Sequence, residues 1–306
     1  MSERTLRRIV LALAVLAALF VVVQAAEFLA WRHGDHGGGV GDAIHRLNTD
    51  TITSMSIVGP VTAPVQLRRD GAHWTANGFP ADSATVTRLL RAAATATLGP
   101  LAGRTTANHA VLGVTDSFAW KLTARSAHDS VSLVLGAPGN GDPGVYVRLP
   151  GRDTVYLVYG QLRPAVVNPI AVWRDRVVLH TDTTRLATVV FTRDRQTYVM
   201  QRGSRGWQGT STDEPAALKE TAAVMAELAH LEAMGFATDA TPPRGNEVRH
   251  VTALTASGDT VANVELLGSV GNDWLVRVAG DSQVYVVSAF DGDRLSPRRE
   301  ELLPHH

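Results

Sequence analysis

One short segment combines an aromatic side chain with charges of both signs, a combination that proteins use to bind partners or to fix neighbouring parts of a chain. It consists of four consecutive residues, Trp173, Arg174, Asp175 and Arg176. Tryptophan and arginine are enriched at the energetic centres of interfaces, so one hypothesis is a partner-docking surface. The other is an inter-repeat clasp, in which Arg–Asp pairing fixes the orientation of two units. The sequence favours the clasp.

Residues that could hold a metal or a cofactor occur only in incomplete patterns. Asp291-Gly292-Asp293 and Asn140-Gly141-Asp142 offer oxygen ligands for calcium, but neither has the full ligand set of an EF-hand loop, so we expect solvated turns. His33 and His36 lie in a Gly-rich tract without further ligands, which favours a spacer. The stretch 136–144 is Gly-rich but no helix is predicted after it, so a hairpin turn is favoured over a dinucleotide loop.

Recognisable catalytic motifs are missing from the sequence. It contains no Gly-x-Ser-x-Gly elbow, no His-Glu-x-x-His pair and no Walker loop. It also contains no cysteine, which excludes disulfides, thiolate nucleophiles, zinc fingers and iron–sulfur clusters. We therefore predict no catalytic residues, no metal site and no cofactor, and we expect a protein that is not an enzyme.

Length and charge narrow the functional class further. The 306 residues exceed what a single small core needs and indicate about two domains. The 29 basic and 29 acidic residues cancel, and no basic stripe is present, so no nucleic-acid partner is expected. Hydrophobic residues make up 45% of the chain, which indicates that most of it folds around packed cores.

The N-terminal region has the pattern of a membrane anchor. Residues 9–26 are apolar apart from Gln24, and three arginines precede them. Eighteen helical residues rise about 27 Å, close to the roughly 30 Å hydrocarbon core of a bilayer. The arginines should stay inside, which places the chain after Trp31 outside the cytoplasm. The alternative is a signal peptide cleaved near residues 23–25, although the apolar run is longer than signal peptides usually have.

The rest of the chain contains an internal repeat with a separation of 129–133 residues. Five landmark pairs keep the same order in both halves: Asp50-Thr51 and Asp182-Thr183, Trp74 and Trp207, Leu135-Gly136 and Leu267-Gly268, Val147-Arg148 and Val276-Arg277, and Val155-Tyr156 and Val284-Tyr285. Because the order is preserved over so many pairs, the sequence predicts two copies of one unit.

Strand signals have the same order in each copy. Apolar alternation and turn residues predict strands at 54–58, 65–69, 119–123, 130–135, 145–149 and 154–158, and again at 186–192, 197–201, 252–255, 261–267, 274–278 and 283–287. A helix is expected between the second and third strand of each copy. The predicted fold class is α+β, a tandem duplication of an antiparallel-sheet-plus-helix unit preceded by one N-terminal transmembrane helix.

The helices are placed by their caps and by apolar spacing. The first should start at Asp82 or Ser83, with helical spacing that extends to Leu98. The second should be capped by Asp213, with Pro215 in its first turn. Trp74 and Trp207 are expected to fill the interface between helix and sheet in their copies, in preference to stacking on a ligand.

These observations divide the chain into segments with stated boundaries. They are a cytoplasmic N-terminus at 1–8, a transmembrane anchor at 9–31, a Gly-rich linker at 32–44, a first α+β repeat at 45–165, an inter-repeat segment at 166–181, a second α+β repeat at 182–290 and a C-terminal tail at 291–306.

Several landmarks also resemble the motifs of a known family. They are Asp50-Thr51-Ile52-Thr53, the hairpin from Leu67 to Trp74, Val111-Leu112-Gly113-Val114, Val145-Tyr146-Val147-Arg148, and Trp173-Arg174-Asp175-Arg176. Together they are similar to the domain of unknown function 4340, over roughly residues 45–290, although the second copy departs from the pattern around 244–251. The resemblance implies an exported, membrane-tethered domain associated with ABC transporters of the gliding-motility type, and it implies no reaction.

The expected function follows from the anchor and the resemblance. We expect a non-enzymatic accessory subunit in the bacterial inner membrane, single-pass with its N-terminus inside and its bulk periplasmic or extracellular. Its expected partners are the membrane, through the N-terminal helix, and an ABC-transporter permease or other envelope proteins. The alternative is an extracytoplasmic binding module for an envelope polysaccharide or peptide.

Overall fold

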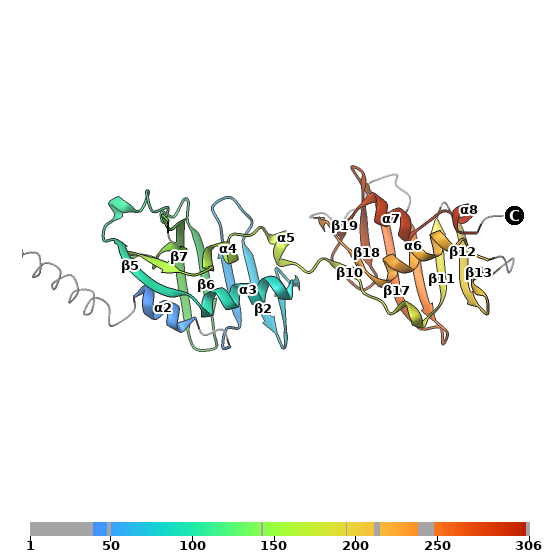
Figure 1. Ribbon diagram of the computed structural model, residues 1–306, viewed down its shortest axis with the longest axis horizontal. Helices are drawn as coiled ribbons and strands as arrows, with labels where there is room; N and C mark the ends of the chain where they lie inside the picture. Colours follow the sequence, from blue (N-terminus) through green and yellow to red (C-terminus); the bar gives the residue numbers. More distant parts are fainter. Residues whose placement is uncertain are drawn as a thin grey trace, which may run out of the picture. The chain divides into compact units, whose positions relative to one another are not determined.

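The chain packs into two compact units, drawn in Figure 1. The computed structural model describes residues 39–47, 50–141, 143–193, 195–210, 215–237 and 248–303. Of the described residues, unit 1 comprises those within 39–72 and 84–169, and unit 2 comprises those within 73–83 and 170–303. The predicted anchor at 9–31 lies outside the described residues. Within the described ranges, no helix is both long enough and apolar enough to cross a bilayer.

The first sheet is antiparallel and has nine strands in the order β4-β3-β2-β1-β6-β7-β8-β9-β5. The strands are β1 (Ser54–Val58), β2 (Val65–Asp70), β3 (His73–Ala76), β4 (Phe79–Pro80), β5 (Thr97–Gly103), β6 (Trp120–Arg125), β7 (Ser130–Pro138), β8 (Gly144–Arg148) and β9 (Val155–Tyr159). The six strands predicted in the first copy are therefore confirmed. Alternate residues of β1 and β6 are buried, as the period of two in the sequence requires.

Short helices accompany this sheet. They are α2 (Val40–Arg46), α3 (Ser83–Ala94), the 3-10 turn η1 (Thr106–Asn108) and α4 (Leu162–Val166). The predicted helix is confirmed as α3, whose buried face includes Val86, Leu89 and Ala93 at helical spacing.

Two predictions for this part of the chain are wrong. Residues 40–44 were assigned to the linker, but they open α2, because Val40, Ala43 and Ile44 share one buried helix face. Leu98 was assigned to the helix, but α3 ends at Ala94 and Leu98 lies in β5. Strand β5 pairs with β9 at the edge of the sheet, so its formation depends on a distant partner that local spacing does not reveal.

The second sheet lies in unit 2 and has eight antiparallel strands in the order β13-β12-β11-β16-β17-β18-β19-β15. The strands are β11 (Leu186–Arg193), β12 (Gln196–Gly203), β13 (Gly206–Gly209), β15 (Gly235–Phe236), β16 (Arg249–Thr255), β17 (Thr260–Val270), β18 (Asp273–Val278) and β19 (Tyr285–Val287). The six strands predicted in the second copy are confirmed. A two-stranded sheet of β10 (Val177–Leu179) and β14 (Leu231–Glu232) accompanies them.

Helices cover one face of the second sheet (Figure 1). They are α6 (Leu218–Ala229), α7 (Ala289–Leu295) and α8 (Arg299–Leu302). Two further elements, α5 (Ile170–Trp173) and the 3-10 turn η2 (Thr183–Arg185), precede the sheet in the chain. One core joins helix and sheet, since Val224 and Leu228 of α6 pack in the same cluster as Val189, Phe191 and Met200. The α+β class with antiparallel sheets and helices is thus confirmed.

Two predictions for unit 2 need correction. Helix α6 begins at Leu218, and Pro215 lies before it in a β-bridge with Gln208, not in its first turn; the predicted cap Asp213 lies outside the described residues. The segment predicted as a C-terminal tail forms α7 and α8, because Leu295 and Leu302 are completely buried in the core.

The strand orders of the two sheets correspond one to one when β4 is left out. The first is β3-β2-β1-β6-β7-β8-β9-β5 and the second is β13-β12-β11-β16-β17-β18-β19-β15. Trp207 is half-buried against the core of unit 2, as predicted, and Trp74 is also half-buried.

Candidate functional site

The predicted segment begins with a side chain that is not accessible. Trp173 is the last residue of α5 and has no exposed surface. Its carbonyl accepts a hydrogen bond from the backbone N–H of Asp82 at 2.9 Å. The aromatic member of the predicted docking surface therefore belongs to the interior.

Arg174 lies between two aromatic rings. Its guanidinium carbon is 4.3 Å from the ring centre of Phe79 and 5.4 Å from that of Phe236. One terminal nitrogen donates to the Gln283 side-chain oxygen at 3.0 Å. Burial lowers the pKa of Arg174. The side chain thus joins the β3–β4 hairpin to strand β15 within unit 2.

The rest of the segment is held mainly by its backbone. The Asp175 N–H donates to the Pro80 carbonyl at 2.9 Å, and the Arg176 carbonyl accepts from the Ala233 N–H at 2.8 Å. The Asp175 carboxylate accepts from the Val177 N–H at 3.0 Å. The Arg–Asp pairing expected of a clasp is not what holds the segment, since Arg174 stacks on rings and Asp175 caps a backbone group.

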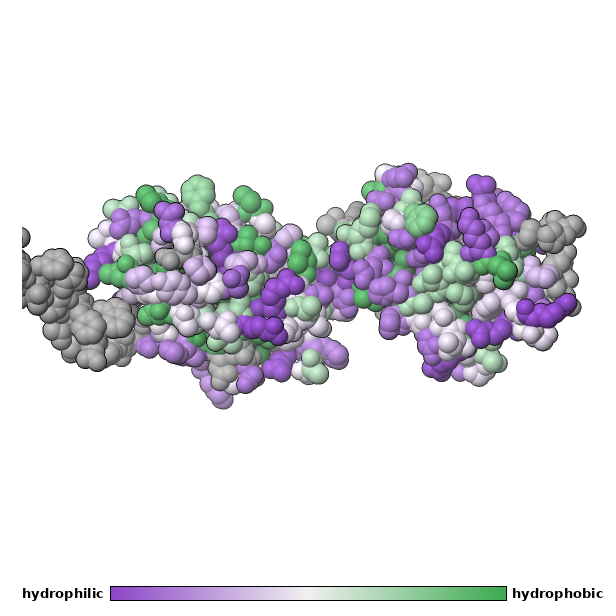
Figure 2. All heavy atoms as spheres, viewed as in Figure 1, coloured by the Kyte–Doolittle hydropathy of each residue, from purple (hydrophilic) through white to green (hydrophobic). Residues whose placement is uncertain are grey.

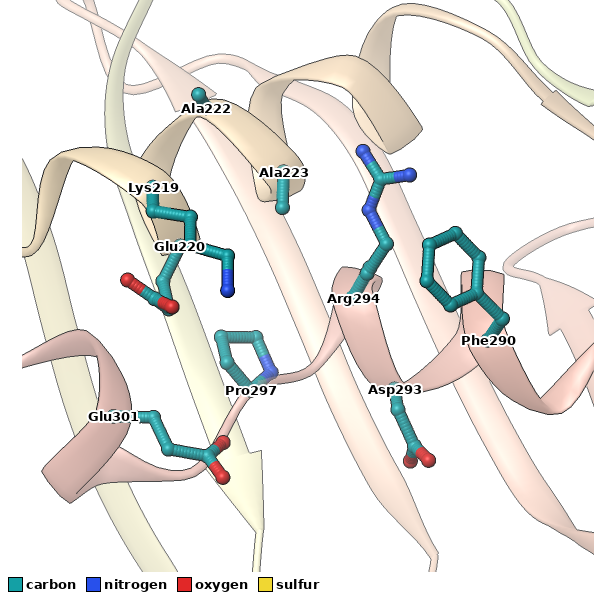
Figure 3. A pocket seen from close by; sticks show the side chains of 9 residues that line it. All are labelled: Lys219, Glu220, Ala222, Ala223, Phe290, Asp293, Arg294, Pro297 and Glu301. Carbon is teal, nitrogen blue, oxygen red and sulfur yellow. The ribbon is translucent and has the colours of Figure 1, made fainter.

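A groove with a volume of about 620 Å³ lies elsewhere in unit 2, where α6 meets α7 and α8 (Figure 3). It is lined by Lys219, Glu220, Ala222 and Ala223 of α6, by Phe290, Asp293 and Arg294 of α7, and by Pro297 and Glu301. Figure 2 shows a weakly hydrophobic strip over α6 bordered by hydrophilic residues. Small side chains on α6 leave the groove open, because alanine fills little of the space between helices.

Arg294 connects α6 and α7, two of the three helices that form this groove. Its guanidinium lies 3.3 Å from the carboxylate of Glu227, whose side chain is only 8% exposed. The same guanidinium lies 5.0 Å from the ring centre of Phe290. Burial raises the pKa of Glu227; Arg294 opposes this rise, and the charge of Asp291 adds to it. The ion pair therefore positions the Phe290–Arg294 pair at the groove.

A second arginine holds α7 from the side of the sheet. Arg249 donates to the Asp293 carboxylate at 3.0 Å, and its guanidinium carbon lies 4.1 Å from the ring centre of Trp274. Gly292 approaches the same ring so closely that a Cβ added there would lie 2.3 Å from a ring carbon. Ser288 caps α7 by accepting from the Asp291 N–H at 3.1 Å.

The link between α7 and α8 is fixed by two side chains of the sheet. Arg193 donates to the Ser296 carbonyl at 2.6 Å, and the Tyr198 hydroxyl donates to the Pro297 carbonyl. Both donors are buried. The wall of the groove that contains Pro297 is therefore fixed to the sheet of unit 2.

The prediction of solvated turns is half right for the acidic groups. Asp291-Gly292-Asp293 is helical, not a turn, and its carboxylates are used by Ser288 and Arg249. Gly141 has a φ of +81°, as a turn requires, whereas Asp142 lies outside the described residues. In the described part of the chain, no three His, Asp or Glu side chains group as metal ligands would.

Sequence reasoning did not select the groove residues. One pattern in the sequence could have indicated them: Ser288 is a suitable helix N-cap, and Phe290 and Arg294 follow it four residues apart, the spacing of neighbours on one helix face. It was missed because the predicted boundary between the second repeat and the tail, at residue 290, divides this segment and leaves Arg294 in the tail.

Comparison with known proteins identifies one family. The model of a domain of unknown function, DUF4340, matches residues 74–249, which is more than half of the chain. No curated protein and no solved structure matches the chain.

Proposed function

The chain belongs to the DUF4340 family, and from that premise we propose that it is a non-enzymatic, membrane-anchored accessory subunit whose bulk lies outside the cytoplasm. Its proposed partner is an ABC-transporter permease or another protein of the bacterial envelope. Because the family description states no activity, the support comes from the sequence and from the groove in unit 2.

The anchor is supported by the N-terminal sequence. An apolar run at 9–26 behind three arginines has the length and the flanking charge of a single-pass helix with its N-terminus inside. In this arrangement both units lie in the periplasm or outside the cell, and the Gly-rich sequence before α2 separates them from the membrane.

We further propose that the two sheets arose by tandem duplication. The shared strand order supports this, and so do two pairs of equivalent backbone hydrogen bonds. In each pair one bond closes the loop before a helix, Ala81 N–H to Trp74 O and Ala216 N–H to Trp207 O, both at 2.9 Å. The other bond ties the next residue to the end of a distant short helix, Asp82 N–H to Trp173 O of α5 and Ala217 N–H to Leu302 O of α8, also at 2.9 Å. A duplicated scaffold provides two similar bodies whose surfaces can diverge.

The observation that carries the accessory role is the exposed Phe290–Arg294 pair beside the groove. Phe290 is 68% exposed, although its backbone is fixed in α7. An aromatic ring and an arginine held in advance form the kind of contact that dominates protein interfaces, because little side-chain freedom remains to be lost on binding. Glu227 is already engaged by Arg294, which supports a structural role for this buried carboxyl.

Co-purification from detergent-solubilised membranes tests the proposal. Phe290→Ala should lose the permease or envelope subunits that the unaltered chain recovers. Val270→Ala is the matched control, because Val270 is 55% exposed at the end of β17 and does not line the groove. Recovery of no envelope protein, or equal recovery with both variants, would contradict the proposed role of the groove.

A further inference from the structure

The face of the unit 2 sheet opposite α6 carries a straight row of polar side chains. The strand registers place one residue from each of five adjacent strands side by side: Thr197 on β12, Thr192 on β11, His250 on β16, Glu265 on β17 and Arg277 on β18. We call these five residues the polar row. Neighbouring strands lie about 4.8 Å apart, so the row is about 19 Å long and runs across the strands.

The polar row faces solvent. On β11 and β16, Phe191 and Val251 point into the core beneath α6, so their neighbours Thr192 and His250 point to the opposite face. The helices α6 and α7 cover only the first of these faces (Figure 1). Each member of the row is partly or largely exposed. Farther along β17 and β18 this face becomes apolar, where Leu267, Leu275 and Val284 form a small buried cluster.

The hydrogen-bonding groups of the row are only partly used by one another. The Thr192 and Thr197 hydroxyls are 3.4 Å apart, and His250 Nδ1 lies 4.0 Å from a Glu265 oxygen, beyond hydrogen-bond distance. The other Glu265 oxygen accepts from Arg277 Nε at 2.9 Å. A ligand hydroxyl between His250 and Glu265 could contact both groups.

The charge of the row restricts the chemistry of its ligand. Glu265 and Arg277 neutralise each other, and the remaining members are two hydroxyls and an imidazole. A row of alternating donors and acceptors with no net charge is complementary to a chain that offers hydroxyls but no charge. It is not complementary to a polyanion, which needs an excess of basic groups, or to a basic peptide.

We propose that the polar row binds an extended, uncharged polysaccharide chain that lies across the strands. The location of such a chain in the cell envelope rests on the proposed export of both units, whereas the binding itself does not. Unit 1 has a similar row across four strands, made of Gln66, Ser56, Thr123 and Ser132. There Gln66 bonds to Ser56 and Thr123 bonds to Ser132, both at 2.9 Å, which leaves fewer groups for a ligand.

Saturation-transfer NMR with uncharged N-acetylglucosamine oligosaccharides and the full chain in detergent micelles tests this proposal. Affinity should rise with chain length until the oligosaccharide spans the row. Thr192→Val removes one hydroxyl of the row and should weaken binding about fivefold. Thr188→Val is the matched control, since Thr188 lies on the same strand and face but outside the row. This variant should bind the oligosaccharide with unchanged affinity.

Three results would overturn the proposal. They are an affinity that does not depend on oligosaccharide length, an equal loss of affinity in Thr192→Val and Thr188→Val, and tighter binding of a polyanionic chain of the same length. None of them bears on the groove, because co-purification of envelope proteins depends on Phe290, on the opposite side of the sheet. The two proposals can therefore fail separately.

Discussion

The carboxylate of Glu227 lies 3.3 Å from the guanidinium of Arg294, and this ion pair ties α6 to α7. The two partners are unequally exposed, with 8% of the Glu227 side chain and 34% of the Arg294 side chain accessible. Removal of Arg294 and removal of Glu227 therefore have different consequences for stability. An arginine left alone can turn to water, whereas a buried carboxylate left alone cannot.

Arg294→Met should destabilise unit 2 more than Glu227→Gln does. We expect a loss of about 2 kcal/mol for Arg294→Met, because the carboxylate stays buried without its partner, and about 1 kcal/mol for Glu227→Gln. Hydrogen exchange of the α6 and α7 amides measures the free energy of opening. The reverse order of the two variants would contradict the assignment of Glu227 as the buried partner.

The stability of unit 2 should depend on pH through Glu227. Its pKa is raised in the folded protein, chiefly by burial, so the folded state holds a proton at pH values where the unfolded state has lost it. The stabilisation is complete below the unfolded value of about 4.3 and is lost as the pH rises through the folded pKa.

Comparison with Glu227→Gln isolates this contribution from those of other carboxyl groups. Wild type minus variant should give a stability difference that falls as the pH rises from about 4. The pKa of Asp182 is lowered by its hydrogen bonds to Thr184, so its contribution to stability changes with pH in the opposite direction. Because Asp182 is present in both proteins, this contribution cancels in the difference. A difference that rises with pH would contradict the burial of Glu227.

The contacts of Arg174 predict a structural effect on substitution. Lysine cannot stack a planar group on Phe79 and Phe236, so Arg174→Lys should cost about 1 kcal/mol, and Arg174→Ala more. Arg205→Ala, in an exposed turn, is the control and should have little effect. Thermal unfolding measures all three. If Arg174→Ala leaves stability unchanged but abolishes recovery of envelope proteins, the segment is a docking surface.

The contact of Gly292 with Trp274 predicts that α7 tolerates no side chain there. Gly292→Ala should improve helix propensity, yet its methyl group would overlap the indole ring, and we expect a net loss of about 2 kcal/mol. Gly235→Ala is the control, because a Cβ added at Gly235 has no atom within 4 Å. Hydrogen exchange of α7 in both variants measures the difference, and equal protection would contradict the close packing of α7.

The strands were largely predictable because their signals are local. Alternation in segments such as 186–192 and 261–267 identifies a half-buried strand without knowledge of its neighbours. The edge strand β5 was missed because Thr97–Gly103 contains Gly99 and Pro100, which are unfavourable in strands, and its pairing with β9 stabilises it instead.

The candidate site was less predictable than the fold. Trp173 and Arg174 stand out in the sequence, but only the structure shows that one is buried and that the other lies between rings from distant segments. The groove joins residues more than 60 positions apart in the chain, from Lys219 to Glu301, so no local pattern contains it. The polar row likewise depends on strand register, which spacing along one strand does not fix.

Cysteine labelling in intact cells tests the central claim, a membrane-held protein with both units outside the cytoplasm. The chain contains no cysteine, so Val270→Cys introduces a single thiol at the exposed end of β17. A membrane-impermeant maleimide should label it in intact cells, and the labelled chain should stay in the membrane pellet after an alkaline wash. Labelling that appears only after lysis, or release of the chain by the wash, would contradict the account.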